Sequence, residues 1–249
     1  MSSVFSLLSQ AWAFYGKQPV LNSIILWMFF LPTAALDLIA WTVHQEESAG
    51  MLTLTLTDRG IALIAFFGTA VIASIVVTIW ADACFLLIAR RIVTGKAGRN
   101  RHSLRAVAHE GRRYIVPLLL TGILMGCFTI FWGLLLIVPG VLYAIRATFY
   151  HVVVVTEGVS YRAALRRSRE AVYGHTWETF LRLLGLSIVL FIPVNIAQIA
   201  VSSLVSEERL ALASAVFFDG LWSIAYTIFL LCLAFLYREL RDMPKPVRL

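Results

Sequence analysis

Two groups of residues in the sequence could support chemistry: the cysteines and histidines, and single charged side chains inside long apolar runs. Cys84, Cys127 and Cys232 have no CxxC spacing and no neighbouring histidine, so they indicate neither a metal site nor a disulfide framework. His102 and His109 have no carboxylate or cysteine at metal-ligand spacing. No HExxH, GxSxG or P-loop pattern occurs. We therefore expect no enzymatic activity, no catalytic residue, no metal site and no cofactor.

The charged residues inside apolar runs are the stronger candidates, because an isolated charge is costly in an apolar environment. Arg146 cannot readily lose its proton to avoid that cost, so an acidic partner is expected. Counting 1.5 Å per residue from the ends of the runs places Arg146, Asp219 and Asp37 in the same half of the membrane. Asp82 approaches the opposite face. We predict a charge cluster of Arg146 with Asp219, Asp37 or both; the alternative is that Arg146 reaches the lipid headgroups alone.

The composition identifies the environment of these charges. Of 249 residues, 60% are hydrophobic and 14% charged, against about 45–50% and about 25% in a soluble domain. The mean hydropathy is +0.84, which favours a lipid bilayer as the solvent. The net charge of +7 comes from arginines and lysines that flank the apolar runs. This pattern fits an anionic lipid surface better than nucleic acid, which we exclude as a partner.

The apolar runs predict an all-α integral membrane protein. We read residues 1–249 as a single membrane domain with six transmembrane helices. The spans are expected at about 20–40, 61–89, 115–138, 141–156, 179–205 and 210–237. The fourth span is short, and a re-entrant segment that does not cross the bilayer is its alternative.

Basic residues set the expected orientation. The segment between spans two and three holds eight arginines and lysines against one acid, and the segment after span four and the C-terminal tail are also basic. The positive-inside rule places all three in the cytoplasm, with both chain termini. A turn at Val138-Pro139-Gly140 is predicted to fold spans three and four into an antiparallel hairpin, because proline cannot continue a helix and glycine permits a sharp reversal.

Two basic segments resemble each other. Residues 103–113 align without gaps on residues 160–170, with four identities and a shared i, i+3, i+4, i+7 apolar stripe. Residues 2–16 align more weakly with 160–174. The pattern predicts three tandem units, each an amphipathic helix on the cytoplasmic side followed by a transmembrane hairpin. The residues expected to bind anionic headgroups or a membrane-protein partner are Arg105, Arg112, Arg162, Arg166 and Arg169.

One stretch resembles a known family. It holds Gly133, Val138-Pro139-Gly140, Arg146, Glu157-Gly158, the run from Ala163 to Ser168, and Tyr173-Gly174. In these elements the chain resembles the bacterial inner-membrane proteins of the YciC type, and the membrane domain fused to some glycerophosphodiester phosphodiesterases. The resemblance implies a bacterial cytoplasmic-membrane location. The phosphodiesterase chemistry is not carried over, because the chain has no such catalytic domain.

Three functions follow as expectations. The first is a non-enzymatic membrane protein that binds anionic lipid or a membrane partner in envelope or lipid homeostasis. The second is a transporter or flippase for a small solute or lipid, with a polar site near Arg146; it requires a polar path from that residue to one face. The third is an accessory subunit of a membrane complex, which requires an exposed apolar patch beyond the lipid belt.

Overall fold

The fold was derived from a computed structural model, which describes residues 3–48, 58–94, 104–205 and 207–243. These residues form helices throughout, joined by short turns. The elements are α1 (Val4–Gly16), α2 (Val20–Ile24), the π-helical segment η1 (Ile25–Phe30), α3 (Leu31–Ser48), α4 (Asp58–Thr94), α5 (Leu104–Leu135), α6 (Ile137–Ala147), α7 (Tyr150–Glu157), α8 (Tyr161–Val172), α9 (Thr176–Leu204) and α10 (Glu208–Asp242).

Within the described residues, six helical stretches are long and apolar enough to cross a membrane, which confirms the all-α, multi-pass class. They run over Val20–His44, Ala65–Arg90, Leu104–Leu135, Ile137–Glu157, Thr176–Leu204 and Glu208–Asp242. The first of them is α2, η1 and α3 in one continuous helical path. Pro32 has no N–H for the Met28 carbonyl, and the hydrogen bonds just before it shift to the wider π pattern, as in the bond from the Leu31 N–H to Leu26.

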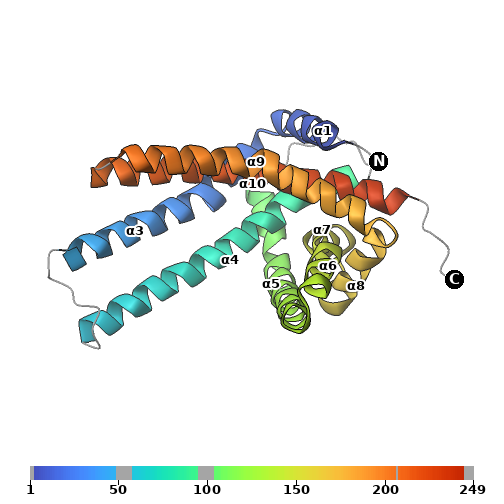
Figure 1. The fold of residues 1–249 in the computed structure, drawn as a ribbon, viewed down its shortest axis with the longest axis horizontal. Helices are drawn as coiled ribbons and strands as arrows, with labels where there is room; N and C mark the ends of the chain where they lie inside the picture. Colours follow the sequence, from blue (N-terminus) through green and yellow to red (C-terminus); the bar gives the residue numbers. More distant parts are fainter. Residues whose placement is uncertain (1–2, 49–57, 95–103, 206, 244–249) are drawn as a thin grey trace.

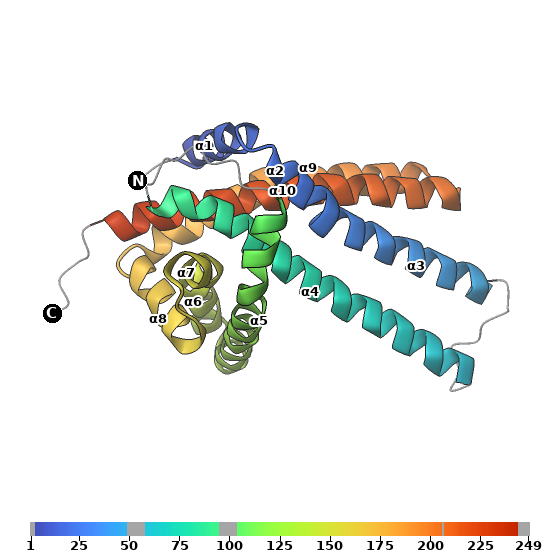
Figure 2. The same ribbon diagram turned by 180° about the vertical axis from the view of Figure 1, so that it is seen from behind.

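Four of these stretches form the long axis of the molecule. Helices α3, α4, α9 and α10 run lengthwise across Figures 1 and 2, while α1, α8 and the end of α10 lie at one end. The end of α3, the start of α4, the end of α9 and the start of α10 all lie at the opposite end (Figure 1). Several of the basic residues used for the topology, Lys96, Arg99, Arg101, Lys245 and Arg248, lie outside the described residues.

The remaining pair, α5 and α6, projects steeply from the other four: in Figure 1 α5 descends from the centre of the molecule, and its lower part and α6 are seen close to end-on. They form the expected antiparallel hairpin, but the predicted position of its turn is wrong. The chain reverses at Leu136, whose φ of −158° and ψ of 129° are extended, and Pro139 and Gly140 lie in the first turn of α6. Proline is tolerated there because the first N–H groups of a helix have no partner within it.

Gly140 serves close packing rather than the turn. A Cβ at this position would lie 2.7 Å from the Cα of Gly133 and 2.8 Å from its backbone nitrogen. The backbones of α5 and α6 therefore meet where both helices carry glycine. This close contact explains why the hairpin has glycine at Gly140, facing Gly133.

The three predicted units are present as helices, with one correction. Helix α1 precedes the first span and α8 precedes α9 as separate elements. In the middle unit, however, residues 104–113 and the third span form one continuous helix, α5, with Pro117 inside it. The break expected before span three is absent: Arg113 is followed directly by Tyr114, Ile115 and Val116, whereas Gly16 and Gly174 lie between the other two pairs.

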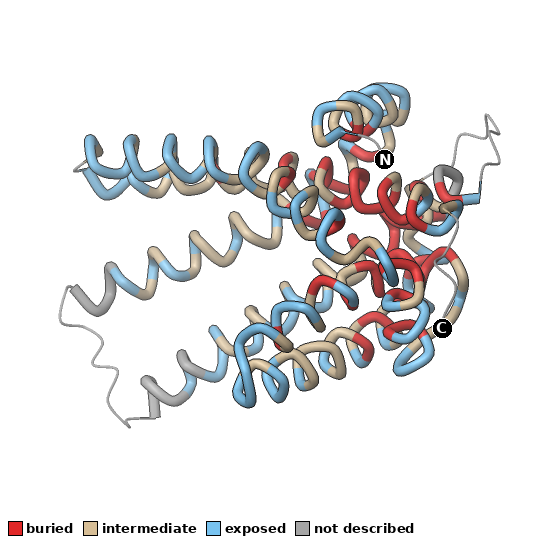
Figure 3. The backbone as a smooth tube through the Cα atoms, turned by 45° about the vertical axis from the view of Figure 1, so that its right-hand side comes forward, coloured by how far each residue is buried: buried red, intermediate tan, exposed pale blue. Residues whose placement is uncertain are grey.

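The packed core lies at one end of the bundle. Figure 3 shows the buried residues gathered at the end that holds α1, α7 and the second half of α10. Helix α7 is at its centre, with Val152, Val153, Val154 and Val155 all buried. Toward the opposite end the helices expose large apolar side chains, for example Ile199 and Phe217. That distribution fits helices that face lipid there.

Cysteine labelling tests whether the α5–α6 hairpin crosses the bilayer. In a variant whose native cysteines are replaced, Leu136→Cys is expected to react with an impermeant thiol reagent added outside intact cells. Glu207→Cys, at the start of α10, is expected to react in the same way, and Arg162→Cys on α8 is expected to stay protected, because the basic segments are predicted to be cytoplasmic. Protection of Leu136→Cys together with labelling of Glu207→Cys would contradict the crossing of span four.

Candidate functional site

A groove on the outside of the bundle is the first candidate site. It lies between α6 and the start of α9 and has a volume of about 320 Å³. The walls are apolar and aromatic, with one hydroxyl at the start of α9. The lining residues are Ile137, Val138, Val141, Leu142, Ile145, Thr176, Trp177 and Phe180. Such walls suit a hydrocarbon chain.

Arg146 lies at one end of this groove. It follows Leu142 by one helical turn on α6, and its Nε donates a hydrogen bond to Oγ1 of Thr176 over 3.3 Å. The side chain is exposed and forms no ion pair with any carboxylate of the described residues. A guanidinium with most of its donors free, next to an apolar groove, is suited to a phosphate or carboxylate group on a lipid.

Helix α8 holds this end of α6 in place. Oγ of Ser168 donates a hydrogen bond to the backbone carbonyl of Arg146 over 2.8 Å. One residue later, the guanidinium of Arg169 lies 5.6 Å above the ring of Tyr143. The other end of α8 is anchored where the N–H of Tyr161 donates to Oγ1 of Thr121 on α5 over 2.9 Å. Arg169 therefore adds a second positive charge beside α6, within one turn of Arg146.

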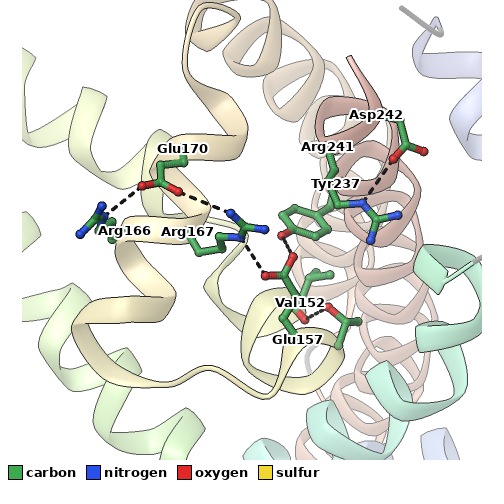
Figure 4. A network of polar contacts seen from close by, with 9 residues as sticks. Val152, Glu157, Arg166, Arg167, Glu170, Tyr237, Arg241 and Asp242 are labelled. Atoms are coloured by element: carbon green, nitrogen blue, oxygen red, sulfur yellow. Dashed lines mark hydrogen bonds and ion pairs between the residues drawn. The ribbon is translucent and has the colours of Figure 1, made fainter. Parts of the chain in front are cut away.

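A polar network at the end of α7 locks α8 onto the core (Figure 4). The Glu157 carboxylate accepts hydrogen bonds from the hydroxyl of Tyr237 on α10 and from Nε of Arg167 on α8, the latter over 2.9 Å. The hydrogen bond to Glu157 raises the pKa of the Arg167 guanidinium above its ordinary value. Gly158 follows with a φ of 72°, a left-handed conformation that glycine adopts without strain. The Glu157-Gly158 pair thus ends α7 and positions α8.

The predicted headgroup-binding arginines are all exposed, but their surroundings differ. On α8, Arg166 is paired with Glu170 at 3.0 Å, while Arg162 has no ion pair within the described part of the chain. On α5, Arg112 lies 5.2 Å above the ring of Trp80. Helix α8 has two faces: its arginines are exposed, while Ala164, Leu165, Ser168 and Val172 are buried. The predicted headgroup-binding residues found exposed on the two helices are Arg105, Arg112, Arg162, Arg166 and Arg169.

The structure does not assemble the predicted charge cluster around Arg146. It brings together only the two acids: the carboxyl groups of Asp37 on α3 and Asp219 on α10 lie close enough to interact with each other. Arg146 instead contacts Thr176, the first residue of α9. The depth count did not show this, because it compares levels along straight spans and does not say which helices lie side by side; α6 runs at a steep angle to α3 and α10 (Figure 1).

The groove residues Thr176 and Trp177, and Tyr143 beside Arg169, were not predicted from the sequence. A signal existed for Trp177, because a tryptophan at the start of an apolar helix is typical of the membrane interface. No comparable signal singled out Thr176 or Tyr143. Among the described residues there is no group of three histidine, cysteine, aspartate or glutamate side chains that could hold a metal ion.

These features define the class: a multi-pass α-helical membrane protein with a basic helix docked at one end of its bundle and an apolar groove beside it. No family model, curated protein or solved structure matches the chain.

Proposed function

We propose that the protein is a non-enzymatic protein of the bacterial cytoplasmic membrane that binds an anionic phospholipid in the groove between α6 and α9. One acyl chain lies along Ile137, Val141 and Leu142, and the headgroup phosphate contacts Arg146 and the hydroxyl of Thr176. From Ile137 to Arg146 the helix rises about 14 Å, enough for most of an extended acyl chain. Arg169 supplies a second charge to the same headgroup.

The observation that carries this proposal is the position of Arg146. It lies at the end of an apolar groove, its guanidinium donates to a hydroxyl rather than to a carboxylate, and a second arginine lies nearby. An acidic partner would have favoured a purely structural role. A transporter would need polar groups along the groove away from Arg146, and the lining there is apolar, so lipid binding is favoured over transport of a polar solute.

Lipid retention by the purified protein tests the proposal. Replacing Arg146 by glutamine is expected to weaken retention of phosphatidylglycerol about tenfold, because a charge-assisted hydrogen bond to phosphate contributes roughly 1.5–3 kcal/mol. Native mass spectrometry in mild detergent, with phosphatidylcholine as the neutral comparison lipid, measures the effect. Binding of phosphatidylcholine is expected to change little.

Arg209→Gln is the matched control, since it removes the same charge from the exposed start of α10 at the other end of the bundle. If Arg146→Gln and Arg209→Gln retain phosphatidylglycerol equally well, the groove is not the anionic lipid site. Adding Arg169→Gln to Arg146→Gln is expected to lower retention further, because both charges face one headgroup.

A further inference from the structure

A second cavity lies on α5, away from the groove between α6 and α9. It occupies about 280 Å³ between α4, α5 and the start of α7. Its polar lining residues are Asp82, Tyr150 and His151, and Gly122 forms part of the wall. The rest of the lining is apolar, from Ile79, Leu118, Leu119 and Ile123.

Asp82 is the charge-bearing group of this cavity. The residue is only 5% exposed, and Oδ2 of its carboxylate accepts a hydrogen bond from the hydroxyl of Tyr226 over 3.3 Å. Oδ1 is buried and has no hydrogen-bond partner among the described residues, and no described basic side chain forms an ion pair with Asp82. A buried carboxylate with one free oxygen is a strong site for a positive charge.

Aromatic side chains form the wall beside it. The rings of Tyr150 and His151 stack with centroids 3.7 Å apart, and Nδ1 of His151 is buried without a hydrogen-bond partner of good geometry in the described structure. The hydroxyl of Tyr150 lies against α5 at Gly122, where a Cβ would come within 2.8 Å of it. Glycine at this position therefore leaves room for the hydroxyl at the cavity wall.

A carboxylate, a phenol hydroxyl and aromatic faces in one cavity are the groups that recognise an ammonium ion. A divalent metal would need several more oxygen ligands than one aspartate supplies, and an anion would meet a carboxylate with no cation beside it. We propose that this cavity binds an ammonium group, with its positive charge against the carboxylate of Asp82 and its N–H donors directed at Asp82 and Tyr150. The group belongs to a phosphatidylethanolamine headgroup or to a small free amine.

The proposal is independent of the groove, which is built from α6 and α9 and selects negative charge. It is tested on the full-length protein with two probes: phosphatidylethanolamine, followed by native mass spectrometry, and free ethanolamine, followed by the thermal unfolding midpoint against sodium chloride of equal ionic strength. A ligand that binds only the folded protein raises that midpoint. Wild-type protein is expected to bind at least one of the probes.

Asp82→Asn keeps the shape of the side chain and removes its charge, so it is expected to weaken binding of that probe by about tenfold or more. Asp219→Asn, an intramembrane acid outside the cavity, is expected to bind like wild type, and phosphatidylglycerol retention is expected to be unchanged in both. Binding of the lipid alone assigns the ammonium group to a headgroup, and binding of ethanolamine assigns it to a free amine.

The proposal is overturned if wild-type protein binds neither probe, or if Asp82→Asn binds as well as wild type. Should Asp82→Asn fail to fold, Tyr150→Phe and Gly122→Ala test the proposal in its place. The first removes the hydroxyl of Tyr150, and the second displaces that hydroxyl. Both are expected to weaken binding several-fold. Unchanged binding in both variants overturns the proposal as well.

Discussion

Replacing Gly140 by alanine is expected to destabilise the protein by about 1–3 kcal/mol, the usual range for forcing extra atoms into a packed contact. The added Cβ would lie 2.7 Å from the Cα of Gly133, and neither backbone can move aside as a flexible side chain could. The helices α5 and α6 would have to separate. This cost exceeds the gain of up to about 1 kcal/mol that alanine brings to a helix.

Gly133→Ala is the matched control for this prediction. The two glycines touch, but a Cβ on Gly133 meets no atom within 4 Å. Alanine at Gly133 is therefore expected to be neutral or slightly stabilising. Thermal unfolding of the two purified variants in the same detergent measures the difference, and equal midpoints would contradict the close contact of the two helices.

The two substitutions also separate stability from lipid binding. Parting α5 from α6 shifts the wall that carries Val141 and Leu142 relative to the start of α9 and so changes the shape of the groove. Gly140→Ala is therefore expected to lose phosphatidylglycerol along with stability. Gly133→Ala leaves the groove intact and is expected to retain the lipid. Because Arg146 is present in both, this comparison tests the shape of the groove rather than its charge.

The number and type of the helices could be predicted because apolar runs of about 20 residues have one common solution in a bilayer. Their ends could not. Helix α4 continues to Thr94 and α10 to Asp242, beyond the predicted limits of 89 and 237, because charged residues near the surface are good helix formers and hydropathy does not detect them. Likewise, hydropathy gave no reason to expect that α5 would begin at Leu104 rather than at the start of the third span.

The predicted site failed where it depended on tilt. Depth counted along each helix placed Asp37 and Asp219 in the same half of the membrane, and their carboxyl groups do lie close together. The same count did not place Arg146 correctly, because the direction in which the α5–α6 hairpin leaves the other helices cannot be read from the spacing of charges along the sequence. The cavity at Asp82 was missed for a different reason: Tyr150 and Tyr226 are ordinary residues in apolar runs, and only the fold brings them to one carboxylate.

Removing the Glu157 side chain has the second large expected effect. Its carboxylate is 19% exposed and accepts hydrogen bonds from Tyr237 and Arg167. In Glu157→Ala the hydroxyl of Tyr237, a residue only 1% exposed, loses its acceptor, and an unsatisfied buried hydroxyl costs about 1–3 kcal/mol. Arg167 is half exposed, so the lost ion pair adds only about 1 kcal/mol. The total expected loss is about 2–4 kcal/mol.

Glu157→Gln separates the two contributions. Glutamine keeps an oxygen that accepts the hydrogen bond from Tyr237 and loses the charge that attracts Arg167, so its expected loss is about 1 kcal/mol. Glu110→Gln is the control: it breaks an exposed ion pair with Arg113 and is expected to change stability by less than about 0.5–1 kcal/mol. Thermal unfolding of the three variants is expected to show the largest loss of stability in Glu157→Ala, a smaller loss in Glu157→Gln and the smallest in Glu110→Gln.

The same series tests whether Glu157 positions α8. Because Glu157 joins α7, α8 and α10, its loss should free α8 before it unfolds the bundle, and Arg169 should leave the ring of Tyr143. Amide hydrogen exchange is expected to rise in residues 161–172 of Glu157→Ala while Val152–Val155 stay protected. Uniform exchange across both segments would show instead that α8 and the core open together, and that the Glu157 network stabilises the whole bundle rather than the docking of one helix.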